Sequence, residues 1–157
     1  MNSVFDLFSA PWFWAGLMSW CVAQTIKMTV DFFRTHRIDF SYFVSTGGMP
    51  SAHSAMVSGL ATSIGMTEGF GSPICVLATA FAVVTMFDAA GVRNAAGQQA
   101  RLLNKMVDEL FTEHKFNTPR LKELLGHTRL EVFAGLLTGV AVSIFVMTYW
   151  WPDKILS

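Results

Sequence analysis

Four apolar stretches dominate the chain, over residues 7–26, 51–66, 69–87 and 132–151. A helix that crosses a bilayer needs about 20 mostly apolar residues, so each stretch is close to the length of a membrane span. The second stretch is the shortest and is rich in Gly, Ser and Thr, which are residues that let membrane helices pack closely. The pattern therefore predicts an all-α fold, a polytopic membrane helix bundle with about four transmembrane helices.

The connection between the third and fourth stretches follows a different pattern. Apolar and charged residues alternate at helical spacing over residues 91–110. An amphipathic helix of this kind can lie on the membrane surface, or it can extend the third span into the cytoplasm, and the pattern leaves both readings open. Pro119 then begins a short helix that ends at Gly126. We expect one or two cytoplasmic or interfacial helices beside the four spans, within a single domain of residues 1–157.

The distribution of positive charge predicts the orientation of the bundle. Ten of the eleven Lys and Arg residues lie in the segments that follow the first span, precede the second, or join the third and fourth, whereas Lys154 lies on the opposite side. The positive-inside rule places those segments in the cytoplasm and both termini outside. The expected location is the inner (plasma) membrane of a bacterium, with the charged face cytoplasmic.

Composition supports a membrane protein and argues against a nucleic-acid partner. Hydrophobic residues make up 52% of the chain and charged residues 14%, whereas about 25% of an average soluble protein is charged. The formal net charge is zero, and the sequence has no basic stripe with interleaved aromatic residues.

Four polar clusters flank the expected spans on the cytoplasmic face: Lys27 with Arg34, residues 47–54, residues 88–93 and residues 126–131. Ionisable groups near membrane depth are unfavourable and usually functional. One such cluster has a simple structural explanation, but four that converge on one face indicate a site.

The cluster at residues 47–54 predicts an anion site. Pro50 suits the first turn of a helix, and the N–H groups and dipole at a helix N-terminus attract anions. Ser51 adds a hydroxyl group, and His53 lies one turn into the helix beside the expected anion. The alternative is a capped helix in which the histidine occurs by chance.

The cluster at residues 126–131 predicts a histidine activated by a carboxylate. His127 and Glu131 are four residues apart, so on a helix they share one face. A carboxylate that holds one imidazole nitrogen fixes the tautomer and leaves the other nitrogen as a nucleophile or base. The alternative is a pair that only caps the last span.

Three cations are candidates for binding phosphate oxygens: Lys27, Arg34 and Arg93. Arginine can make bidentate contacts with phosphate, and lysine acts as a point charge. Each could instead serve only to set the topology, which is the favoured reading for Arg37. Asp88 either holds one of these cations or simply ends the third span.

Taken together, these motifs resemble those of the type 2 phosphatidic acid phosphatase and vanadium haloperoxidase superfamily. Lys27, six residues and Arg34 resemble its first motif, Pro50-Ser51-Ala52-His53 its second, and His127, three residues and Glu131 the end of its third. Over residues 24–139 the chain is more closely similar to a divergent small branch, the acid phosphatase/vanadium-dependent haloperoxidase-related proteins.

The resemblance implies a metal-independent phosphatase without a cofactor, acting on a lipid-linked phosphate such as phosphatidate, phosphatidylglycerophosphate or a polyprenyl phosphate. It implies that His127 attacks phosphorus, Glu131 orients His127, and His53 protonates the leaving alcohol. Lys27, Arg34 and Ser51 would bind the phosphate oxygens. The expected partners are this substrate and membrane lipids, and the sequence leaves open whether copies of the chain form a homo-oligomer.

Departures from the superfamily pattern support an alternative function. Leu121 occupies the position where the third motif has arginine, so Arg93, Arg120 or Lys122 would have to replace that charge. Ala52 replaces a glycine of the second motif. A catalytically degenerate protein, which binds a lipid phosphate or has a structural role in the membrane, is therefore the alternative to the enzyme.

Overall fold

The computed structural model describes residues 5–36, 48–110 and 126–155, and all regular structure in these ranges is helical. The elements are α1 (Asp6–Ser9), α2 (Pro11–Thr35), α3 (Ala52–Glu68), α4 (Pro73–Ala90), α5 (Val92–Leu110), α6 (Arg129–Trp150) and the 3-10 helix η2 (Pro152–Lys154). The all-α prediction is confirmed for the described part of the chain. The short helix predicted over residues 119–125 lies outside it.

Each of the four apolar stretches contains one long helix, with shifted boundaries. The first stretch is divided at Ala10, which is extended and separates α1 from α2, and α2 then continues to Thr35, past the expected end at residue 26. By length and apolar composition, α6 and the continuous segment Pro73–Asp108 could cross a membrane. Spanning by α2 and α3 stays a prediction.

Small residues bring α2, α3 and α6 into close contact. A Cβ added to Gly139 of α6 would overlap the Ala55 carbonyl and Ser58 of α3, and one added to Gly59 of α3 would overlap Ser19 of α2. The Ser58 hydroxyl donates to the Leu136 carbonyl of α6 at 3.2 Å. Close backbone approach and serine hydrogen bonds are the means by which helices associate without a hydrophobic driving force, so these three helices form the packed centre.

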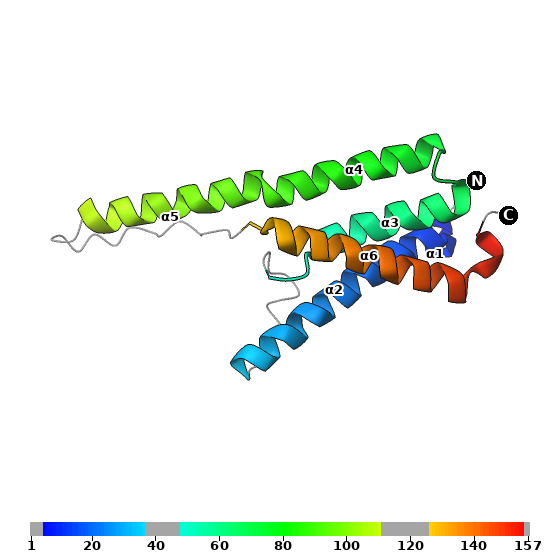
Figure 1. Cartoon of the computed structure of the whole chain (residues 1–157), viewed down its shortest axis with the longest axis horizontal. Helices are drawn as coiled ribbons and strands as arrows, with labels where there is room; N and C mark the ends of the chain where they lie inside the picture. The colour runs from blue at the N-terminus through cyan, green and yellow to red at the C-terminus, as the bar shows by residue number, and fades with distance from the viewer. Residues whose placement is uncertain (1–4, 37–47, 111–125, 156–157) are drawn as a thin grey trace.

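The helices α4 and α5 form a long arm beside this centre. They follow one another in nearly one line, and α5 projects past the ends of α2, α3 and α6 (Figure 1). Only Cys75, Ala82 and Ala89 of α4 are buried, while large side chains such as Phe81 and Phe87 are exposed. The collinear arrangement corresponds to the second reading of residues 91–110, in which they extend the third apolar helix away from the bundle.

The two ends of the bundle differ in chemistry. Asp6 of α1, Glu68 of α3 and Lys154 of η2 line one pocket, which places the two ends of the described chain together. The starts of α3 and α6 and the end of α4 meet at the opposite end (Figure 1), and this is where the polar clusters lie.

Candidate functional site

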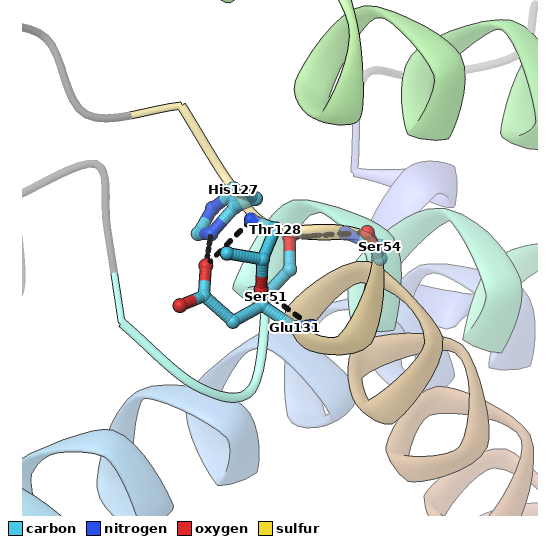
Figure 2. Close-up of polar contacts among 5 residues, drawn as sticks. All are labelled: Ser51, Ser54, His127, Thr128 and Glu131. Atoms are coloured by element: carbon cyan, nitrogen blue, oxygen red, sulfur yellow. Dashed lines mark hydrogen bonds and ion pairs between the residues drawn. The ribbon is translucent and has the colours of Figure 1, made fainter. Parts of the chain in front are cut away.

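His127 and Glu131 are held together by the start of α6. The helix begins after Thr128, whose side chain accepts a hydrogen bond from the Glu131 N–H at 3.3 Å, while the Glu131 carboxylate accepts one from the Thr128 N–H at 3.1 Å. This reciprocal pair is a capping box. The same carboxylate oxygen, Oε2, lies 3.0 Å from Nδ1 of His127 (Figure 2). The capping box therefore holds the carboxylate in the position from which it contacts the imidazole.

The expected reason for the His127–Glu131 pairing was wrong, although the pair itself is present. His127 does not lie on the helix, because α6 starts at Arg129 and His127 precedes the N-cap residue. The pair joins a residue ahead of the cap to the third residue of the helix. His127 is buried, with 3% of its surface exposed. A carboxylate beside Nδ1 favours the tautomer in which Nδ1 carries the proton.

Two backbone hydrogen bonds join three of the predicted clusters. The Ser51 N–H donates to the Glu131 carbonyl at 3.0 Å, and the His127 N–H donates to the Ala89 carbonyl at 3.1 Å. The start of α3, the end of α4 and the start of α6 therefore meet at one point. The convergence predicted for residues 47–54, 88–93 and 126–131 is observed for their described parts.

Lys27 brings the first cluster to the same place. Its side chain lies along the backbone of Gly48, where an added Cβ would be 3.4 Å from the Lys27 Cγ and Cδ atoms. Gly48 also has a φ of 82°, which favours glycine. Lys27 lies one residue beyond the first predicted span and is 3% exposed. Burial lowers the pKa of the Lys27 ammonium, and the Glu131 carboxylate opposes this shift, so the two charges attract one another.

Ser51 precedes the first residue of α3, and this start of the helix differs from the expected one. Pro50 was predicted in the first helical turn, but α3 begins at Ala52 and Ser51 is the N-cap residue. The Ser51 hydroxyl accepts hydrogen bonds from the Ser54 N–H at 3.4 Å and the Ser54 hydroxyl at 3.0 Å (Figure 2). Ser51 is fully buried, and the proposal that it binds phosphate stays a prediction.

His53 differs from His127 in exposure. It lies in the first turn of α3, two residues after Ser51, and its side chain is exposed, whereas that of His127 is buried. A buried histidine oriented by a carboxylate suits a nucleophile. An exposed one at the same end of the bundle can exchange protons with solvent. The role of His53 as the general acid stays a prediction.

Some predicted phosphate ligands can be placed only by their backbones. Arg34 is in the last turn of α2 and Arg93 is in the first turn of α5, and their binding roles stay predictions. Arg37, Arg120, Leu121 and Lys122 lie outside the described ranges. Asp88 is partly buried in the last turn of α4, next to Ala89.

Sequence reasoning missed three contributors to this site. The capping box could have been found, because Thr128-Arg129-Leu130-Glu131 has the spacing of that motif. The contact between Gly48 and Lys27 had a weaker signal, a glycine pair ahead of a helix. The Ala89 carbonyl gives no signal in sequence, because it acts through its backbone.

The fold and site define an all-helical protein in which a capped histidine–carboxylate pair and a buried lysine meet at the starts of two helices. The Divergent PAP2 family matches residues 8–142, and the chain belongs to this family, as the resemblance predicted. A relative from Bacillus subtilis (strain 168), described as the uncharacterized membrane protein YuiD, is 42% identical over 138 residues, which are 81% of this chain and 87% of the relative. No solved structure matches the chain.

Proposed function

We propose that this chain is an integral membrane phosphatase that hydrolyses a lipid-linked phosphate through a phosphohistidine at His127. The observation that carries the proposal is the 3.0 Å contact between His127 Nδ1 and Glu131, made beside the buried Lys27. A fixed tautomer with Nε2 free of its proton is the arrangement that nucleophilic catalysis requires. Membership of the Divergent PAP2 family supports the same chemistry.

The reaction divides into two displacements at phosphorus. In the first, His127 Nε2 forms a bond to phosphorus while the bond from phosphorus to the lipid oxygen breaks, and His53 donates a proton to that oxygen. In the second, a water molecule gives a proton to His53 and attacks phosphorus, which releases inorganic phosphate and restores His127. Lys27, with Arg34 and Arg93, would neutralise charge on the equatorial oxygens, which is the main catalytic requirement of phosphoryl transfer.

The large apolar side chains exposed on α4 and α6 support a location within the bilayer. Phe81, Phe87, Phe133 and Phe145 are among them, and contiguous exposed apolar surface is rare on soluble monomers. The relative from Bacillus subtilis is described as a membrane protein. We propose the inner membrane of a bacterium, with both termini outside and the site at the cytoplasmic face, where ten of eleven basic residues fall. A substrate of the phosphatidate, phosphatidylglycerophosphate or polyprenyl phosphate type fits that location.

The alternative function is a protein that binds a lipid phosphate without hydrolysing it, or that has a structural role in the membrane. The observation that favours it is Leu121, which stands where the superfamily places an arginine. Removal of His127 separates the two functions, because a binding protein tolerates loss of the attacking nitrogen and an enzyme does not.

The test is phosphate release by the purified protein from a panel of lipid phosphates. We expect His127→Ala to lower the rate by at least about 10³-fold, and vanadate to compete with the substrate. His36→Ala is the matched control, because His36 is an exposed histidine at the end of α2 and should keep the parent rate. Equal rates for His127→Ala and His36→Ala would refute the enzyme, and binding without release by the parent protein would establish the alternative.

A further inference from the structure

An apolar groove of about 590 Å³ runs between α2 and α3, and Leu7 of α1 and Ile74 at the start of α4 also line it. Its lining includes Phe13 and Gly16 of α2 and Met56, Leu60 and Ile64 of α3, and Glu68 is the one charged residue along it. Volumes between about 300 and 1,000 Å³ with mostly apolar walls are typical of ligand sites. Met56 is 43% exposed, so the groove is open on one side rather than sealed in the core.

The register of α3 connects this groove to the candidate active site. Met56, Leu60, Ile64 and Glu68 are each four residues apart and follow one face of the helix. His53 lies three residues before Met56 and belongs to the same face. From Met56 to Glu68 the face is roughly 18 Å long at 1.5 Å per residue, which is slightly more than half of the roughly 30 Å hydrocarbon core. The groove thus begins one helical turn from His53 and has about the depth of one leaflet.

Charge at the two ends of the groove gives a bound amphiphile one direction. The end near His53 lies on the side of the bundle that holds the buried Lys27. The other end holds Glu68, with Asp6 and Lys154 in the adjoining pocket, so the formal charge there is net negative and would repel an anion. A lipid phosphate therefore fits with its headgroup at the His53 end and its hydrocarbon chain directed toward Glu68.

We propose that this groove binds one extended hydrocarbon chain of a long-chain lipid phosphate and so selects long-chain substrates. The proposal rests on the proposed function for the identity of the headgroup. The groove supplies a second binding site, separate from the phosphate site, and its contribution grows with each methylene buried between Met56 and Glu68.

Photolabelling of the unmodified protein tests where the chain lies. The probe is a long-chain alkyl phosphonate with a diazirine at the end of its chain, which cannot be hydrolysed, added to the protein in phospholipid nanodiscs. We expect labels on Phe13, Leu60 or Ile64, and competition by the same phosphonate without the diazirine. Labels spread over the exposed faces of α4 and α6, or labels that do not compete, would overturn the proposal.

A substitution that fills the groove tests selectivity. Leu60→Trp should lower the ratio of kcat/KM for a long-chain over a short-chain phosphate by about tenfold, as expected when two methylenes can no longer be buried. Ile144→Trp is the control, because Ile144 is exposed on α6 outside the groove and should leave the ratio unchanged. An unchanged ratio for Leu60→Trp contradicts the proposal. If the ratio is unchanged and the mass of the oligomer shifts, the groove is instead an interface with a second copy of the chain.

The two proposals can fail separately. If the protein releases no phosphate but the phosphonate still labels the groove competitively, the chain-binding proposal is supported and the phosphatase proposal is contradicted. If His127→Ala abolishes hydrolysis while labelling is dispersed, the phosphatase proposal is supported and the chain-binding proposal is contradicted.

Discussion

The centre formed by α2, α3 and α6 and the arm formed by α4 and α5 are built on opposite principles. In the centre, glycines and serines bring backbones so close that a single added methyl group would overlap a neighbour. In the arm, large apolar side chains point outward, and Phe87 is 74% exposed. The starts of α3 and α6, which carry Ser51, His53 and Glu131, belong to the centre.

The difference shows how a small membrane protein can hold a polar site without a large core. Contacts between backbones are rigid, because carbonyl groups and glycines have no rotamers to adjust. The close packing fixes where α6 lies. The hydrogen bonds from Ser51 to Glu131 and from His127 to Ala89 then hold Ser51 and His127 in place relative to α6 and α4. The arm contributes one carbonyl to this arrangement. Changes in the centre should therefore alter activity or stability strongly, and changes in the outer arm only weakly.

Among the changes that leave His127 in place, the largest effect is expected for Glu131→Gln. Glutamine can preserve the capping box, since the motif accepts Glu or Gln at that position, but it removes the carboxylate charge that orients and stabilises the His127 imidazole. We expect kcat to fall about 10³-fold, equivalent to roughly 4 kcal/mol, with little change in thermal unfolding.

Glu131→Ala provides the comparison for that prediction, because it removes both the cap and the carboxylate. It should lower activity similarly and also destabilise the protein by about 1 kcal/mol. If Glu131→Gln retained the parent kcat, the carboxylate would act only as a helix cap.

The next largest effect is expected for Gly139→Ala. The added Cβ would overlap the Ala55 carbonyl group and the Ser58 hydroxyl, so α3 and α6 must move apart. We expect the free energy of unfolding to fall by about 3 kcal/mol, at the upper end of overpacking effects. Chemical unfolding in mixed micelles, followed by circular dichroism, measures the change.

Gly16→Ala is the matched control for the centre, because Gly16 is also a helical glycine facing α3. An added Cβ there would lie 3.5 Å from the Met56 carbonyl oxygen, in ordinary contact. The variant should be neutral or more stable by about 0.5–1 kcal/mol through helix propensity. Equal destabilisation by both alanines would show that close packing is not specific to Gly139.

A smaller effect is expected for Lys27→Met, which keeps an unbranched side chain of nearly the same length and removes its charge. The phosphate loses a charge-assisted contact, so kcat/KM should fall about 30-fold, or roughly 2 kcal/mol. Stability should be unchanged or higher, because the lowered pKa of Lys27 means that burial disfavours its charged form more than the Glu131 carboxylate favours it. Lys105→Met on the exposed arm is the control and should match the parent in both assays, and a similar loss in the two variants would argue against a specific role for Lys27.

The smallest effect is expected in the arm. Leu102 of α5 is 60% exposed, so Leu102→Ala should change the free energy of unfolding by no more than about 0.5 kcal/mol. Thermal unfolding of the two proteins side by side is sufficient to detect a larger change. A loss comparable to that of Gly139→Ala would mean that α5 is as tightly packed as the centre, and the contrast between the two regions would be wrong.

The sequence predicted the elements better than their ends. Apolar stretches located α2, α3, α4 and α6, because long apolar segments are a strong signal. Pro50 was wrongly placed inside a helix, because proline also suits the residues before an N-cap. Ser51 is the N-cap residue instead. Lys27 and Gly48 were found in separate motifs, but their contact depends on how α2 lies beside the start of α3, which local sequence does not encode.

The measurement that tests the central claim most directly is the identity of the covalent intermediate. The protein is mixed with a lipid phosphate carrying radiolabelled phosphate, quenched in alkali within the turnover time, and digested for mass spectrometry. We predict a base-stable, acid-labile phosphate on His127, absent in His127→Ala and formed more slowly in His53→Ala, which cannot protonate the departing lipid oxygen. Turnover with no phosphate on His127, or with phosphate on another residue, would contradict the mechanism.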